Sequence, residues 1–192
     1  NGAVYVSVSN GITFTHSGNS ASGNGKRGII MQGTLTTDQT WTADNIPYVV
    51  AGITVNSGKT LTVNSGAIMK FESTSAGFTV TGTLAAQGTT GSKIYFTSLK
   101  DDNVGGDTNA DGSTTSPAAG NWYSIYLNAS TASSTIEHAV IRYGGYNLPN
   151  VYKSNGYLNL SNSEVATSST AVIQQDAGTA YISNSDIHGQ SY

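Results

Sequence analysis

The chain has 192 residues, of which 37% are hydrophobic and only 10% are charged, and its formal net charge is −3. So few charged side chains argue against a fold of solvent-exposed helices, whose outer faces need long charged residues. The weakly acidic balance also argues against a nucleic-acid partner, and the sequence has no long apolar run that would insert into a membrane.

Thr, Ser, Asn and Gly replace the missing charged residues, which favours pleated strands joined by turns. In the N-terminal half, apolar strands recur in groups of three. The first strand of each group begins at Ile29, Ile53 and Phe78, and the second carries Leu35, Leu61 and Leu84. The third lies around Trp41, at 68–71 and at 94–96. Equivalent positions are 23 to 26 residues apart, which indicates a repeating structural unit.

The C-terminal third repeats with a similar period. Ile136, Leu160 and Ile182 are 24 and 22 residues apart, and the segments at 161–165 and 183–187 are nearly identical. Three short strands per period indicate a coil in which each strand pairs in parallel with its equivalent one turn away. We therefore predict an all-β, right-handed parallel β-helix of about six coils of 22–26 residues, with residues 1–192 as a single domain. An antiparallel sandwich is the alternative.

Residues 99–120, here called the acidic loop, interrupt the repeats and hold four of the eight Asp residues. Oxygen-bearing residues at alternate positions, followed by Gly112, have the spacing of a Ca²⁺ loop. The usual glutamate at the twelfth position is absent, since Ala118 stands there. The predicted ligands of a structural Ca²⁺ are Asp101, Asp102, Asp107, Asn109, Asp111 and Ser113. The alternative is a solvated acidic loop without a metal.

Several short motifs stand out between residues 33 and 143. They are Gly-Thr-Leu at 33–35, Gly-Thr-Leu-Ala-Ala-Gln-Gly-Thr at 82–89, Ile-Tyr-Phe-Thr-Ser at 94–98, Gly-Gly-Asp-Thr-Asn-Ala-Asp-Gly at 105–112 and Asn-Trp at 121–122. Together they resemble the right-handed parallel β-helix repeat module of bacterial cell-surface and secreted, adhesin-like proteins. The resemblance implies a location outside the bacterial cell and a place within a longer chain, but it implies no activity.

Aromatic residues follow the acidic loop and suggest a binding surface. Exposed rings in a row can stack on sugars, although half of them could instead cap the interior. The candidate ligand-binding residues are Trp122, Tyr123, Tyr126, Tyr143, Tyr146, Tyr152 and Tyr157. The leading prediction is a non-catalytic module for adhesion or carbohydrate binding with a structural calcium loop. Its partner would be a polysaccharide, or a ligand on a host or cell surface.

Two alternatives remain open. A polysaccharide lyase or glycoside hydrolase needs converging carboxylates or a base, whereas Asp101 and Asp102 belong to the acidic loop. The three histidines have no apparent partner in the sequence. A purely structural stalk needs neither carboxylates nor a ligand. Thr-x-Thr pairs such as Thr60/Thr62 are scattered among different strands, which favours ordinary outward-facing threonines over an ice-binding ladder.

Overall fold

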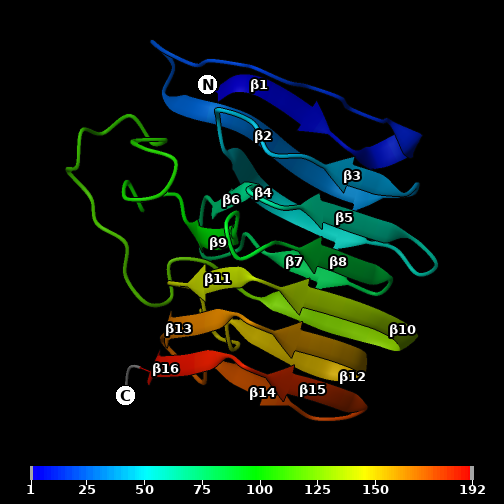
Figure 1. Ribbon diagram of the computed structural model, residues 1–192. Coiled ribbons are helices and arrows are strands. Elements are labelled where there is room, and N and C mark those ends of the chain that lie inside the picture. Colours follow the sequence, from blue (N-terminus) through cyan, green and yellow to red (C-terminus); the bar gives the residue numbers. More distant parts are fainter. Residues whose placement is uncertain (1, 191–192) are drawn as a thin grey trace.

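The computed structural model describes residues 2–190, which form a stack of short parallel strands (Figure 1). The chain winds around three sides of an apolar interior, and one continuous sixteen-stranded sheet follows it around the corners. Each strand pairs in parallel with its equivalent in the next turn. This arrangement confirms the predicted parallel β-helix. None of the described residues belongs to a helix long and apolar enough to cross a membrane.

The three sides of the coil are called the first, second and third face. The first face holds β1 (Gly2–Ser7), β6 (Ile68–Phe71), β9 (Ile94–Ser98), β11 (Ala139–Arg142), β13 (Glu164–Ser168), β16 (Asp186–Gln190) and the first parts of β2 (Lys26–Leu35) and β4 (Tyr48–Val55). The second face holds the remainder of β2 and β4, β7 (Phe78–Val80), β14 (Ile173–Gln175) and the first parts of β10 (Ile125–Glu137) and β12 (Val151–Ser161). The third face holds β3 (Gln39–Trp41), β5 (Thr60–Asn64), β8 (Thr83–Gln87), β15 (Thr179–Ser183) and the remainder of β10 and β12. A short 3-10 turn, η1 (Ser9–Gly11), follows β1.

The coil has about eight turns rather than the predicted six. Six turns pass through all three faces, and β1 and β16 add an incomplete turn at each end. The predicted number of turns was therefore too low. The repeats were recognised by groups of three strands, and β1 and β16 do not belong to such a group.

Alternate residues of each strand fill the interior, as the period of two requires. In β5, for example, Leu61 and Val63 are buried while the flanking Thr60 and Thr62 are partly exposed. Aromatic rings stack along the interior across neighbouring turns, and the rings of Phe71 and Trp122 are 4.2 Å apart at an interplanar angle of 18°. The apolar interior is therefore continuous from turn to turn.

The strand register confirms the predicted C-terminal repeat and corrects the N-terminal one. Ile136, Leu160 and Ile182 are paired as predicted, and so are Ile53 with Phe78 and Leu61 with Leu84. However, Ile29 pairs with Tyr48 and Leu35 with Val55. The predicted alignment failed there because β2 and β4 each bend around a corner, so one apolar run supplies strands to two faces. Of the third strands, 68–71 and 94–96 pair as predicted but one residue out of register, with Ile68 opposite Tyr95, whereas Trp41 pairs with Val63 instead.

The two ends of the described coil differ. At the N-terminal end, the segment between η1 and β2 lies over the interior, and its Phe14 and Ala21 pack against the core. At the C-terminal end, Ile182 of β15 and Ile187 of β16 are 44% and 43% exposed.

Candidate functional site

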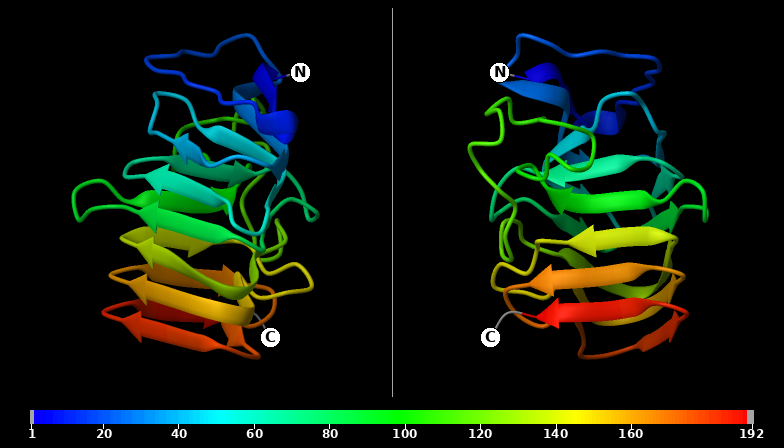
Figure 2. Two further views of the ribbon diagram at one scale, coloured as in Figure 1. Left: turned by 90° about the vertical axis from the view of Figure 1, so that its right-hand side faces the viewer. Right: turned by 60° about the vertical axis from the view of Figure 1, so that its left-hand side comes forward.

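The acidic loop connects β9 to β10 and lies against the outer side of the first face (Figures 1 and 2, green). Near its start, Leu99 packs on Ile30 of β2 and Val49 of β4. Further along, the carbonyl oxygen of Thr108 accepts a hydrogen bond of 2.8 Å from the backbone N–H of Arg27. The loop therefore reaches from the turn that begins with β9 back to the turn that begins with β2. Counting the incomplete turn of β1 as the first, these are the fifth and the second turns.

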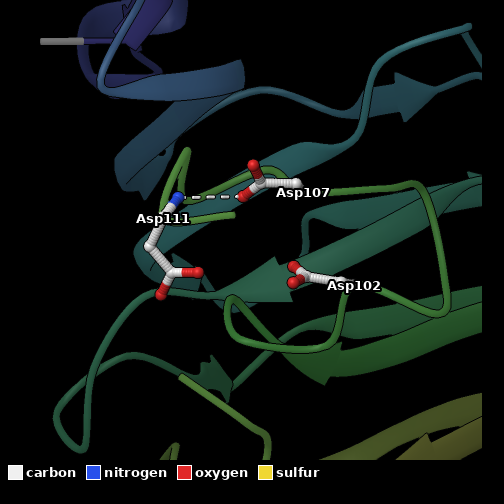
Figure 3. A group of neighbouring side chains, drawn as sticks. All are labelled: Asp102, Asp107 and Asp111. Atoms are coloured by element: carbon white, nitrogen blue, oxygen red, sulfur yellow. Dashed lines mark hydrogen bonds between the residues drawn. The ribbon is translucent and has the colours of Figure 1, made fainter. Parts of the chain in front are cut away.

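Three carboxylates converge at the centre of the acidic loop (Figure 3). Asp102, Asp107 and Asp111 each offer one oxygen, and these oxygens all lie within 4.8 Å of one another. Two oxygens bound to one Ca²⁺ at about 2.3–2.6 Å are at most about 5 Å apart. The spacing of the three carboxylates therefore fits a single calcium ion.

Short-range hydrogen bonds hold the alternate positions of the loop in place. The carboxylate of Asp107 accepts hydrogen bonds from the backbone N–H groups of Asp111, at 3.0 Å, and Gly112, at 3.2 Å. Gly112 has a φ of +63°, a left-handed conformation that costs glycine little. Although slight burial acts in the opposite direction, the hydroxyl of Thr115 and nearby backbone N–H groups hold the pKa of Asp111 below its usual range. Asp111 is therefore ionised at neutral pH.

Three side-chain oxygens of the acidic loop are buried without a hydrogen-bond donor. They are Oδ1 of Asp101, Oδ1 of Asp102 and Oδ1 of Asn109. The amide nitrogen of Asn109 donates to Asp111 at 2.7 Å and to Thr115 at 3.1 Å. The side-chain oxygen of Asn109 therefore points away from these two residues. Leaving a buried acceptor unsatisfied costs about 1–3 kcal/mol, and more when it is charged. Of these three residues, only Asp102 belongs to the converging carboxylates, and a hard cation could satisfy its unbonded oxygen.

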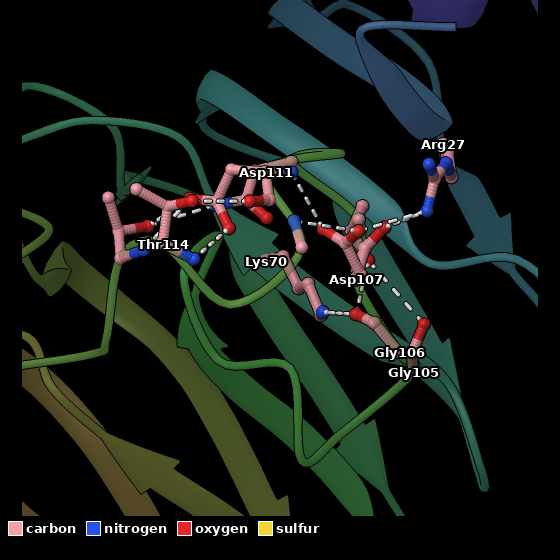
Figure 4. Close-up of polar contacts among 11 residues, drawn as sticks. Arg27, Lys70, Gly105, Gly106, Asp107, Asp111 and Thr114 are labelled. Carbon is pink, nitrogen blue, oxygen red and sulfur yellow. Dashed lines mark hydrogen bonds and ion pairs between the residues drawn. The ribbon is translucent and has the colours of Figure 1, made fainter. Parts of the chain in front are cut away.

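Two basic side chains reach the same loop from the first face (Figure 4). Lys70, fully buried in β6, donates a hydrogen bond of 2.7 Å to the carbonyl oxygen of Gly106. Arg27 forms an ion pair with Asp107 at 3.0 Å. Burial lowers the pKa of Lys70 to about 8, although the nearby carboxylates of Asp101, Asp102 and Asp107 act in the opposite direction.

The charges near the acidic loop are unequal. Its four aspartates carry four formal negative charges, whereas Lys100 of the loop, Lys70 and Arg27 supply three positive charges, which leaves an excess of one negative charge. Sequence reasoning overlooked Lys70 and Arg27. The signal for Lys70 was a lone cation within the apolar segment 68–71.

The structure separates the six predicted ligands into two groups. Asp102, Asp107 and Asp111 lie together, with Asn109 bound to Asp111. Asp101 is outside the converging group, and its other oxygen accepts a hydrogen bond of 2.6 Å from the hydroxyl of Thr97. Ser113 is exposed.

Comparison with protein-family models, curated proteins and solved structures finds no match for this chain. The function is therefore inferred from its own residues.

The candidate aromatic residues do not form one surface. Trp122 is a correction, because its ring is fully buried in the interior and its Nε1 donates a hydrogen bond of 2.9 Å to the carbonyl oxygen of Arg142. Tyr126 and Tyr152 stack on each other with ring centroids 5.2 Å apart, so each ring covers one side of the other. Tyr143 lies near the guanidinium of Arg142.

The other three candidates lie at two separate places. Tyr123 and Tyr146 line a shallow cleft at a corner, together with Thr74, Ser75 and Asn147. Tyr157 lies on the third face and is 51% exposed.

One polar cluster was not predicted. His16 lies between Asp44, with 2.6 Å from Nδ1 to Oδ2, and the hydroxyl of Tyr48, 2.5 Å from Nε2. The side chains of His16 and Asp44 are 6% and 0% exposed. The cluster joins the segment between η1 and β2, which covers the N-terminal end of the interior, to Asp44 and Tyr48 of the coil, and its burial indicates a structural contact. Sequence reasoning overlooked it because residues 12–25 contain no repeat.

Asp44 is expected to make the stability of this covering segment depend on pH. Burial would raise its pKa, but hydrogen bonds from Asn19, His16 and the backbone of Asn45 outweigh burial and hold the pKa well below its usual range. The stabilisation that ionised Asp44 provides is therefore fully present above the pKa of about 3.9 that Asp44 has in the unfolded chain. It is lost as the pH falls from there toward the lower pKa of Asp44 in the folded chain.

The variant Asp44→Asn is expected to be less stable than the wild type by about 2 kcal/mol at pH 7, because a buried acceptor loses its charge-assisted hydrogen bonds. Urea unfolding at pH 7, 5 and 3 measures the difference, which should shrink below about pH 4. A difference that stays constant from pH 7 to pH 3 would contradict this assignment.

Proposed function

We propose that this chain is a non-catalytic β-helix module that acts outside the bacterial cell, as a binding or adhesive part of a secreted or surface protein. Its acidic loop binds one structural Ca²⁺. The observation that carries the calcium site is the convergence of Asp102, Asp107 and Asp111, of which Asp102 has a buried oxygen without a donor. The resemblance of residues 33–143 to adhesin-like modules supports the location and the binding role.

A structural role for the ion fits the position of the loop. Lys70 and Arg27 connect the loop to β6 and β2, and Leu99 packs on the same face. An ion held by the three aspartates would therefore stabilise the contact between the loop and the strands.

Calcium is expected to raise the melting temperature of the chain. An ion at one hundred times its dissociation constant stabilises the folded state by about 2.7 kcal/mol. For a chain of this size, that corresponds to a rise of about 5–10 °C. Differential scanning calorimetry in 5 mM CaCl₂ and in EGTA measures the shift. The double variant Asp107→Asn/Asp111→Asn should lose it.

The matched control is Asp186→Asn, which removes a carboxylate that is 77% exposed at the opposite end of the coil and should keep the calcium response. Equal melting temperatures of the wild type in calcium and EGTA would overturn the calcium site. An equal rise with MgCl₂ would show general screening of the acidic loop instead of a calcium site.

A further inference from the structure

The third face lies away from the acidic loop (Figure 1). The acidic loop covers part of the first face. The second face carries the Tyr126–Tyr152 stack, and the hydroxyl of Tyr152 is bonded to Asp176. On the third face, the strands from β3 to β15 lie one above another (Figure 1).

The central outward column of the third face is uncharged. Strand pairing places Thr40, Thr62, Ala85, Thr135, Asn159 and Tyr181 directly above one another. Threonines that looked scattered in the sequence, such as Thr40 and Thr62, are therefore stacked in register. The neighbouring outward column has one charged residue and consists of Asn64, Gln87, Glu137, Ser161 and Ser183.

Two tyrosines project from this face. Tyr157 is 51% exposed and Tyr181 is 68% exposed. Tyr157 pairs with Thr179, and Tyr181 is two residues further along the same strand, so both rings point outward on the same side. Neighbouring strands are about 4.8 Å apart, and alternate residues of one strand are about 6.7 Å apart. The Cα atoms of the two tyrosines lie on the diagonal, roughly 8 Å from each other.

Neither ring is held by an aromatic or hydroxyl contact. Among residues 2–190, Tyr157 and Tyr181 stack on no other aromatic ring, and their hydroxyls form no hydrogen bond. Burying a large ring is favourable, and the exposed parts of these two rings, beside Asn159, are available to an external partner.

We propose that Tyr157 and Tyr181, with Asn159 between them, bind a neutral polysaccharide whose sugar rings lie flat on the third face. The C–H groups of a pyranose match the negative face of an aromatic ring. Its hydroxyls match the amide and hydroxyl side chains of the outward columns, each of which both donates and accepts. A charged polymer gains no partner from the uncharged central column.

The test is retention of the intact chain on microcrystalline cellulose, chitin beads and, as the charged control, alginate beads. The wild type should be retained on at least one neutral polymer and not preferentially on alginate. The double variant Tyr157→Ala/Tyr181→Ala should bind that polymer about tenfold more weakly, since it loses two stacking contacts. The matched control Tyr5→Ala removes a ring that is 58% exposed on the first face and should bind like the wild type.

No retention on either neutral polymer, or equal retention of the wild type and the double variant, would overturn the inference. Because the inference rests on the proposed binding role, the calcium response is measured on the same samples. Tyrosine-dependent retention without a calcium shift would overturn the calcium loop alone. A calcium shift without retention would overturn the third-face site alone. A normal melting curve for the double variant confirms that it is folded.

Discussion

The substitution Lys70→Met is expected to destabilise the folded chain by about 3–5 kcal/mol, because it removes one partner of a buried charge cluster. The side chain of Lys70 is fully buried in β6 and donates to the carbonyl oxygen of Gly106. Methionine has a similar length, so the packing of the stem is largely kept. The loss is therefore mainly one of charge and hydrogen bonding to the acidic loop.

Guanidinium chloride unfolding in EGTA measures this effect without a contribution from calcium. The control is Lys100→Met, which removes an exposed lysine from the acidic loop itself and should change stability by less than about 0.5 kcal/mol. If the two variants were equally stable, Lys70 would not anchor the loop.

The substitution Trp122→Ala is expected to cost about 3–5 kcal/mol, because it opens a large cavity in the interior. Its indole ring stacks on Phe71 and its Nε1 donates to Arg142 across neighbouring turns. Trp122→Phe keeps a ring in contact with Phe71, so its cost should be clearly smaller. Chemical unfolding of both variants provides the measurement.

Tyr146→Ala is the surface control for this comparison, since Tyr146 is 43% exposed at a corner of the coil. We expect it to change stability by less than about 0.5 kcal/mol. If Trp122→Ala were as mild as Tyr146→Ala, the indole would not support the interior.

The repeating part of the fold could be predicted because it is recorded in neighbouring, similar residues. The pairs Glu164/Asp186 and Val165/Ile187 align in the structure as they do in the sequence. The N-terminal register could not be predicted in the same way. Ile29 and Ile53 look equivalent, but β2 continues around a corner and brings Gly33 opposite Ile53.

The candidate metal site was partly predictable for a similar reason. Asp107, Asn109 and Asp111 are close in sequence, so their spacing alone indicates that their oxygens can converge. The contacts with Lys70 and Arg27 connect residues 36 and 80 positions apart. They depend on how the loop folds back over the first face, which no local pattern records. Likewise, the burial of Trp122 depends on how the segment before β10 enters the interior, where its ring stacks on Phe71.

The return of the acidic loop from the fifth turn to the second affects how the coil comes apart. A solenoid normally unfolds turn by turn, because each turn contacts only its neighbours. Here Arg27 and Thr108 join turns that are not adjacent. The second to fifth turns should therefore open as one cooperative unit, and force applied along the axis should meet a mechanical clamp there. The turns after β10, which lack such a connection among the described residues, should fray independently.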